Sequence, residues 1–533
     1  MHSVSSPATQ TGVTRRAKAA PRPLHAQSSA QPQRRIGWHR VITAHLAILA
    51  VPVVPYYYMR VLGTDLFFLH VFIATVYLLT ALMMFQETSV AMWQRFAAQP
   101  IFPRTRNDAW WQTVKGFLGA RGARRPDAVR PVPRASIIVA AFLPNEADII
   151  VETLEHLLLH VRRPAGGLEV ILSYNTPVRM SVEQELEDLA QRFPALRLLR
   201  VAGSETKAEN LNAALDVVSG EITAILDADH MPRPDCLERA WHWLESDYDV
   251  VQGRSVVRNF ASNLETRCIA VEFECMYGVS HPARSLWVDT AIFGGSNGYW
   301  RTDVLRRVRF DPRMMTEDID ASLRALLQGH RIVADRSIVS TELAVADFRS
   351  FWFQRKRWAQ GWLQVSLKYQ REVWQSPHFG WRQKLYWTYL LGFRELYPLL
   401  SLQIFPVLIS LILIHGALPL WSHWYLWGSA LITFASSPVQ VVVATKNAVT
   451  GFPRRDAVGY AFFAFFYVML KNMIWVIALF DHLTRNTDWI VTRRELSESM
   501  RRLEEEQRKS QRNGAWAGLH QVRSALRSGF RFL

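Results

Sequence analysis

The sequence predicts an α/β domain with a mainly parallel sheet, inserted between helices that span a membrane. Long apolar runs gather toward both ends of the 533-residue chain, in which 49% of the residues are hydrophobic. Between them, from residue 134 to about 350, short β-branched segments alternate with segments of helical spacing. Strands that alternate with helices are typical of a parallel sheet with crossover helices.

The amino-terminal segment is basic, and the whole chain has a net charge of +16. Residues 1–64 contain no Asp or Glu but several Arg, and the segment is rich in Pro, Ser, Ala and Gln. We therefore expect residues 1–37 to be a disordered tail held in the cytosol by its charge. An organelle transit peptide, also rich in Arg and Ser, is the alternative. The three cysteines lack metal-ligand spacing, and their odd number argues against a disulfide framework.

Five apolar stretches are candidates to cross a membrane, for which about 20 apolar residues suffice. The stretches 41–62 and 65–85, joined by Gly-Thr-Asp, predict a hairpin, and 385–419, 421–445 and 457–480 follow the central domain. Three crossings after a cytosolic domain would place the basic carboxyl terminus outside, against the positive-inside trend. Either the last stretch, with Lys471 and Asn472 in its middle, is broken or re-entrant, or residues 385–397 hide a further crossing.

Carboxylates follow one of the buried strands of the central domain. The segments "RASIIVAAF", "LEVILSY" and "ITAILDAD" are predicted strands, and the last ends in Asp227 and Asp229. Ligands in open α/β sheets lie beyond the carboxyl ends of strands, and two carboxylates at this spacing can share a divalent cation bound to a diphosphate. A plain turn after a strand is the alternative.

Three further segments carry polar groups suited to the same chemistry. "TEDID" contains Asp318, a candidate general base at a helix start that Thr316 would cap. "SETKAENLN" supplies Lys207 as a phosphate contact, or simply an exposed helix start. "FGGSN" is a Gly-rich loop in which Ser296 and Asn297 could meet a sugar, or which could simply be a turn.

The stretch "FWFQRKRWAQGW", residues 351–362, places cations among aromatic rings just before a long apolar region. With this stretch, the order of motifs resembles the processive family-two glycosyltransferases, which include cellulose, chitin, hyaluronan and curdlan synthases. The matching residues are Asp227 and Asp229, then Gly295, Ser296 and Asn297, then Thr316, Glu317 and Asp318, then Gln354, Arg357 and Trp358.

The resemblance implies a GT-A type domain that uses a nucleotide-sugar donor, usually a UDP-sugar, with Mg²⁺ or Mn²⁺ held by Asp227 and Asp229. Asp318 would deprotonate the acceptor, and the single displacement would invert the anomeric carbon. Donor contacts would also include Lys207, Asn145 and Glu146. The acceptor and the diphosphate would meet Gly295, Ser296, Asn297, Gln354, Arg357 and Trp358, whereas Trp352 and Trp362 would anchor their helix in the lipid headgroups.

One segment departs from the family pattern, and another resembles a second family motif. Where the family usually carries a carboxylate after its second strand, this chain has Ser173, Tyr174 and Asn175. Near the end, "DWIVTRRE" resembles a gating element, which would make Trp489, Thr492 and Arg493 a cap over the bound donor. A basic interfacial segment is the alternative for those three residues. With His230 after the two aspartates, the motif "DADH" resembles that of cellulose-type synthases.

The expected organisation is a tail (1–37), a transmembrane hairpin (38–86), a connector (87–133), a cytosolic catalytic domain (134–350), interfacial helices (351–397), transmembrane channel helices (398–482), and a gating segment with a basic tail (483–533). We expect a multi-pass protein of the bacterial inner membrane that polymerises a β-linked polysaccharide, β-glucan from UDP-glucose, and translocates it. Its partners would be the UDP-sugar, the growing polysaccharide and membrane lipids, without nucleic acid. A non-processive enzyme acting on a membrane lipid and a non-catalytic transporter or scaffold are the alternatives.

Overall fold

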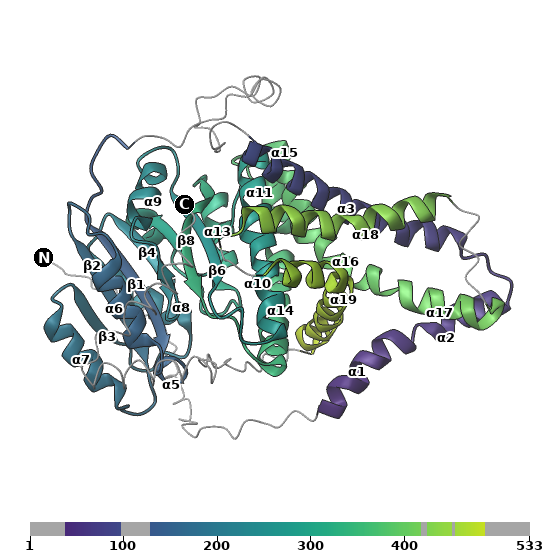
Figure 1. The fold of residues 1–533 in the computed structure, drawn as a ribbon, viewed down its shortest axis with the longest axis horizontal. Helices are drawn as coiled ribbons and strands as arrows, with labels where there is room; N and C mark the ends of the chain where they lie inside the picture. Colours follow the sequence, from purple (N-terminus) through teal and green to yellow (C-terminus); the bar gives the residue numbers. More distant parts are fainter. Residues whose placement is uncertain (1–37, 97–127, 417–423, 450–452, 485–533) are drawn as a thin grey trace, which may run out of the picture.

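The computed structural model describes residues 38–96, 128–416, 424–449 and 453–484. These residues form a sheet domain with a bundle of long helices at one side, as Figure 1 shows. The strands are β1 Ala135–Phe142, β2 Leu168–Asn175, β3 Leu196–Arg200, β4 Ile222–Asp227, β5 Met231–Pro232, β6 Val250–Val257, β7 Gly298–Arg301 and β8 Ile332–Glu342. The predicted arrangement, an α/β domain between helices long and apolar enough to span a membrane, is confirmed.

The sheet is mixed rather than mainly parallel. Its order is β3-β2-β1-β4-β7-β6-β8-β5. The first four strands are parallel neighbours, as the sequence predicts, but β7 is antiparallel to both β4 and β6. The chain re-enters the sheet from the carboxyl end of β4, because Gly298 at the start of β7 lies opposite Ile225. The loop before β7 is therefore placed beside Asp227.

Helices cover both faces of the sheet, which explains the continuous apolar runs of its central strands. Alternate residues of β1 enter two different cores, Ile137 and Val139 on one face and Ile138 and Ala140 on the other. The domain helices are α5 Leu143–Glu146, α6 Ile150–His160, α7 Val182–Arg192, α8 Lys207–Val217, α9 Cys236–Leu244, α10 Leu264–Cys275, η1 Met276–Ser280 (a π-helix), α11 His281–Val288, α12 Thr302–Val308 and α13 Glu317–Leu327.

The remaining helices form the bundle and its junction with the domain. They are α1 Trp38–Ala50, α2 Val53–Val61, α3 Phe67–Phe96, α14 Phe348–Gln375, α15 Trp381–Thr388, η2 Tyr389–Phe393 (a π-helix), α16 Arg394–Leu402, α17 Ile404–His415, α18 Trp424–Asn447 and α19 Arg454–Leu483. Among the described residues, five helical stretches are long and apolar enough to span a membrane. Large apolar side chains such as Phe68 and Leu431 are exposed on their surfaces.

Helix α3 continues to Phe96, beyond residue 86 where the predicted hairpin ends. The cause lies in Glu87, which is buried and accepts hydrogen bonds from Arg284 Nε at 2.9 Å and from the Tyr386 hydroxyl at 2.8 Å. These contacts join the end of α3 to α11 and α15. The first residues of the expected connector, 87–96, are therefore the last part of helix α3, which packs on the domain.

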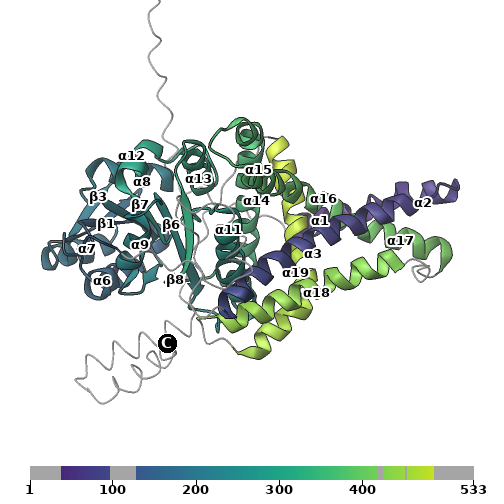
Figure 2. The same cartoon turned by 90° about the horizontal axis from the view of Figure 1, so that it is seen from above.

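Helix α19 lies across the bundle rather than along it. Figures 1 and 2 both show it next to α14, crosswise to α3 and α18. Its first turn carries Asp456, which pairs with Arg267 of α10 at 3.7 Å, and its last turn carries Asp481, which accepts a hydrogen bond from Lys356 of α14. Both ends of α19 thus contact helices on the domain side of the bundle.

Candidate active site

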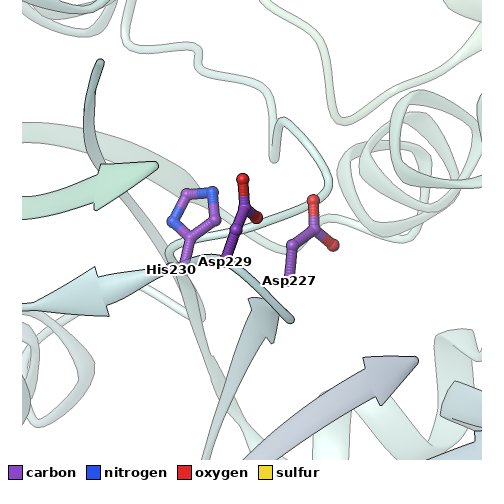
Figure 3. A group of neighbouring side chains, drawn as sticks. All are labelled: Asp227, Asp229 and His230. Carbon is purple, nitrogen blue, oxygen red and sulfur yellow. The ribbon is translucent and has the colours of Figure 1, made fainter. Parts of the chain in front are cut away.

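Two carboxylates and an imidazole meet where β4 ends (Figure 3). One ligand atom from each of Asp227, Asp229 and His230 lies within 4.8 Å of the others. Asp229 and His230 are fully buried, whereas Asp227 is partly exposed. The donor set fits a divalent cation such as Mg²⁺ or Mn²⁺, because both prefer carboxylate oxygens.

The imidazole of His230 is oriented by the end of β8. Its Nε2 lies 2.9 Å from Glu342 Oε2 and its Nδ1 lies 3.1 Å from Ser340 Oγ. Asp229 is also tied to this strand end, since its Oδ2 accepts the Leu343 N–H at 2.9 Å. Sequence reasoning missed Glu342, although it is an acid at the end of an apolar strand, the same signal that pointed to Asp227.

Lys207 is the first residue of α8, and its ammonium lies at the same cluster. Thr206 and Glu209 form a capping box that fixes the start of this helix. The ammonium donates hydrogen bonds to Asp227 Oδ1 and, at 2.8 Å, to the carbonyl of Gly295. Burial alone would lower the pKa of Lys207, but nearby carboxylates, Asp227 first, raise it above the usual value. A cation is thus fixed beside the carboxylate of Asp227.

The loop before β7 brings the predicted base to this cluster. Gly295 has φ +87°, and a Cβ atom there would lie 2.9 Å from Asp318 Oδ2, so the loop needs glycine at this position. Ser296 accepts the backbone N–H of Asp227 at 2.9 Å. Asn297 is fully buried and donates to the carbonyls of Arg254 at 3.1 Å and Ile338 at 3.2 Å. Its side chain therefore braces the sheet beneath the loop.

Asp318 lies in the first turn of α13, and its Oδ1 accepts the N–H of Ile319 at 2.9 Å. Burial, together with the neighbouring Glu317, raises the pKa of Asp318 to about 7, even though Lys207 and Arg357 lower it. A carboxyl with this pKa can accept a proton near neutral pH. The position at a helix start agrees with the sequence prediction.

The predicted cap by Thr316 is wrong. Thr316 occupies the N-cap position of α13, but its side chain makes no capping hydrogen bond. Helix α14 passes so close that a Cβ atom at Gly361 would lie 2.4 Å from Thr316 Cγ2. The hydroxyl is therefore turned against α14, and the contact fixes the start of α13 on that helix.

Helix α14 holds the segment that leads to the base. Arg357 donates to the carbonyl of Met315 at 3.1 Å, and Gln364 Oε1 accepts the N–H of the same residue at 3.1 Å. One turn into α13, the fully buried Asp320 accepts hydrogen bonds from Lys368 and Tyr369 of α14 at 2.8 and 2.7 Å. The helix with the Gln-x-x-Arg-Trp motif and the helix with the base are thus joined at several points.

The remaining residues of the predicted acceptor segment differ in their exposure. Trp358 and Gln354 are both partly exposed. Trp352 is only 4% exposed and lies beneath the Lys356 ammonium, so the prediction that it reaches the lipid headgroups is wrong. Its ring centroid lies 6.4 Å from that of His45 of α1, and it belongs to a buried cluster that includes residues of α10, α18 and α19. Trp362 is half-buried beneath the Arg394 guanidinium, 3.7 Å from the ring centroid.

The remaining predicted donor residues follow β1. Because β1 pairs with β4 so that Ala140 lies opposite Asp227, Asn145 and Glu146 of α5 lie at the same edge of the sheet. Glu146 Oε2 accepts the N–H of Phe142 at 2.6 Å, so it also shapes this turn. The predicted gating residues Trp489, Thr492 and Arg493 lie outside the described residues, as does the basic tail 1–37.

After β2, where the family usually has a carboxylate, amide groups form a hydrogen-bonded network. Asn175 Oδ1 accepts from Asn210 Nδ2 at 2.8 Å, and the Ser173 hydroxyl donates to the carbonyl of Asn210 at 2.7 Å. These bonds join the end of β2 to α8, the helix that begins with Lys207. In place of the usual carboxylate, this chain therefore has neutral side chains that bond to the helix beginning with Lys207.

Comparison with known proteins identifies the class of this domain. Residues 222–437, from β4 into α18, match the model of glycosyl transferase family group 2, so this part of the chain is similar to that family. Within that class it is similar to a cellulose synthase catalytic subunit (UDP-forming) from Komagataeibacter sucrofermentans, with 30% identity over 193 residues that cover 34% of this chain and 25% of the relative. The predicted resemblance is confirmed.

Two further proteins are similar to this chain. The β-monoglucosyldiacylglycerol synthase of Synechocystis sp. is 27% identical over 260 residues, which cover 48% of this chain and 53% of that enzyme. The solved structure of a mannosyltransferase from Pyrobaculum calidifontis, in complex with GDP-Man and Mn²⁺, is 19% identical with a TM-score of 0.42, covering 76% of this chain and 99% of that one. The alignments span at most about half the length of these two curated relatives.

Proposed function

We propose that this protein is an inverting glycosyltransferase that polymerises a β-linked polysaccharide and moves it across the bacterial inner membrane, with UDP-glucose as the donor. One observation carries the proposal: the Asp318 carboxylate lies against Gly295, whose carbonyl binds the same Lys207 ammonium that contacts Asp227. This arrangement supports a role for Asp318, whose pKa is raised to about 7, as the base beside the predicted metal ligands and the predicted phosphate contact.

Each residue has a distinct part in the proposed reaction. Asp318 accepts the proton of the acceptor hydroxyl as that oxygen bonds to the anomeric carbon, while the bond between that carbon and the diphosphate oxygen breaks. Asp227 and Asp229 would hold the divalent cation, which neutralises charge on the leaving UDP. Lys207 and Arg357 add positive charge on the diphosphate side, and Trp358 offers a flat apolar face to the acceptor sugar.

Polar and aromatic groups inside the helix bundle support a path for a sugar chain. Four rings, Tyr389, Phe393, Tyr397 and Tyr77, follow one another with centroid distances of 5.5, 6.4 and 5.8 Å. Arg394 and Glu395 form an ion pair at 2.7 Å nearby. Ionisable groups are costly inside a bilayer and generally serve function there. The basic composition of residues 1–64 supports a cytosolic catalytic domain.

A second candidate is a non-processive enzyme that glycosylates a membrane lipid. The observation in its favour is the similarity to the β-monoglucosyldiacylglycerol synthase, which extends over more residues than the similarity to the cellulose synthase subunit. Such an enzyme needs the same donor site but no path through the bundle. A non-catalytic scaffold is the third candidate, and it gives no reason for a buried acid, a lysine and two strand-end carboxylates to meet.

A screen of UDP release across common nucleotide sugars tests the proposal, with linkage analysis of any product. We expect release with UDP-glucose in the presence of Mg²⁺ or Mn²⁺ and a β-linked polymer that an endo-β-glucanase degrades. A single sugar recovered on a lipid would favour the second candidate. No UDP release with any donor would favour the third.

A further inference from the structure

Three consecutive cations of α14 bind three different parts of the protein. Arg355 donates to Glu272 of α10 at 2.5 Å, Lys356 to Asp481 of α19, and Arg357 to the carbonyl of Met315 at 3.1 Å. This explains why cations stand among aromatic residues in "FWFQRKRW". Arg355 and Lys356 are buried, but each is paired with a carboxylate, which offsets the cost of removing the charge from water.

Glu272 joins three helices. Its Oε2 accepts hydrogen bonds from Arg355 and, at 2.8 Å, from the hydroxyl of Tyr467, and its Oε1 accepts from Lys471 at 2.7 Å. Burial would raise the pKa of Glu272, but the two cations and the hydrogen bonds lower it to about 2. The carboxylate is therefore ionised at physiological pH, and α19 holds it through two side chains.

The guanidinium of Arg355 covers one face of Trp358, with 4.4 Å between the Arg355 Cζ and the ring centroid. A guanidinium is flat and stacks on an aromatic ring, whereas the ammonium of a lysine cannot. Because Glu272 fixes the guanidinium, it also restricts the tilt of the ring. A sugar can then stack only on the opposite face of Trp358.

We propose that Arg355, held by Glu272 and through it by Tyr467 and Lys471 of α19, is a positioning residue that orients Trp358 for the acceptor sugar. This inference rests on the proposed glycosyl transfer. The position of α19 thereby affects how the acceptor is held, while the donor site at Asp227 and Lys207 is left unchanged. Loss of the arrangement should let water compete with the acceptor, so that UDP is released without transfer.

The decisive variant is Arg355→Lys, because it keeps the charge beside Glu272 and removes only the flat stacking group. The matched control is Arg371→Lys, an exposed position on the same helix. Loss of the planar stacking of a guanidinium on the ring justifies an effect of about tenfold. In the full-length protein we expect the ratio of sugar transferred to UDP released to fall about tenfold in Arg355→Lys, with UDP binding by calorimetry unchanged. Glu272→Gln should act in the same direction.

A second measurement does not depend on activity. With 5-fluorotryptophan incorporated throughout, the ¹⁹F resonance of Trp358 can be assigned as the signal that Trp358→Phe removes. It should shift in Arg355→Lys and stay in place in Arg371→Lys. An unshifted resonance, or an unchanged ratio of transfer to release, overturns the inference even if Glu272→Gln fails to fold. If wild-type protein releases no UDP from any donor, the proposed function fails, and the resonance alone then decides whether Arg355 orients the ring.

Discussion

At the residue scale, the account depends on Asp318 as the base. Asp318→Asn is nearly isosteric, so the start of α13 and its contact with Gly361 should be retained. The amide cannot accept the proton, and loss of a general base typically costs a factor of about 100 to 10,000 in rate. We expect UDP release under saturating donor to fall by that factor, while UDP binding by calorimetry changes little.

The control for this variant is Asp303→Asn, because Asp303 is also an acid in the first turn of a helix but is exposed. It should transfer sugar at the wild-type rate. If Asp318→Asn turns over like wild type, Asp318 is only a helix-start acid. If it loses UDP binding as well, Asp318 belongs to the donor site, and the division of roles given above is wrong.

The pKa of Asp318 predicts a pH dependence. The base works as a carboxylate, so it is inactive when protonated below its pKa and active above it. Because burial and Glu317 raise that pKa to about 7, against the lowering effects of Lys207 and Arg357, the transfer rate should rise as the pH increases through about 7 and then level off. A rate–pH profile at saturating donor measures this, and a profile already flat at pH 5 would contradict it.

Asp229 should be required for metal-dependent donor binding. Asp229→Asn removes one hard oxygen ligand, and even groups that only support metal ligands are worth about 10–100-fold in affinity. We expect UDP binding in Mg²⁺ or Mn²⁺ to weaken by at least that factor, and transfer to be lost. Asp216→Asn, at an exposed carboxylate on α8, is the control and should bind as wild type does. Equal affinity in the two variants would remove Asp229 from the metal site.

Sequence reasoning located the strand-end and helix-start acids because local pattern determines those positions. Asp227 ends a run that is buried on both faces, and Asp318 lies two residues after Thr316, the residue at the N-cap position of α13. The sequence could not show that Lys207 meets Asp227 and Gly295, that Thr316 faces Gly361, or that Trp352 is buried near His45. Each of these contacts joins segments far apart in the chain, so it depends on how the elements pack rather than on local spacing.

At the scale of elements, the contacts of α19 help to decide how many times the chain crosses the membrane after the sheet domain, which the sequence left open. A third crossing after the domain would place the carboxyl terminus outside, but Asp456 and Asp481, near the two ends of α19, pair with α10 and α14 on the domain side. Lys471, in the middle of the helix, also binds α10 through Glu272. Because α19 is one unbroken helix of 30 residues, the broken or re-entrant alternative is wrong, and the contacts agree better with a helix that lies along the domain side of the bundle than with a crossing.

We expect both ends of α19 to lie on the cytosolic side. Single cysteines at Pro453 and Thr484 in a variant lacking the three native cysteines can be tested with a membrane-impermeant maleimide. In right-side-out vesicles neither should react, and both should react in inverted vesicles. A cysteine at Asp65, in the turn between the first two spans, is the control that reacts from outside. Labelling of residue 484 from outside would show that α19 crosses the membrane.

At the scale of the whole molecule, the proposal needs the donor site, the acceptor ring and the bundle to be continuous. Helix α14 connects them, because it contacts the segment before Asp318 through Arg357, presents Trp358, and carries Trp362 beneath Arg394 of the bundle. The five candidate spans were predictable from length and hydropathy alone, but the crosswise position of α19 was not. The order in which α10, α14 and α19 meet at Glu272 was not, because their charges can pair in several ways.

The size of the product tests the central claim most directly. Purified full-length protein in lipid vesicles is supplied with radiolabelled UDP-glucose and Mg²⁺ or Mn²⁺, and the product is separated by size with and without an endo-β-glucanase. The account predicts UDP release together with a long polymer that the glucanase degrades, and neither in Asp318→Asn. Label recovered only as single sugars on lipid, or no UDP release from any common nucleotide sugar, would contradict it.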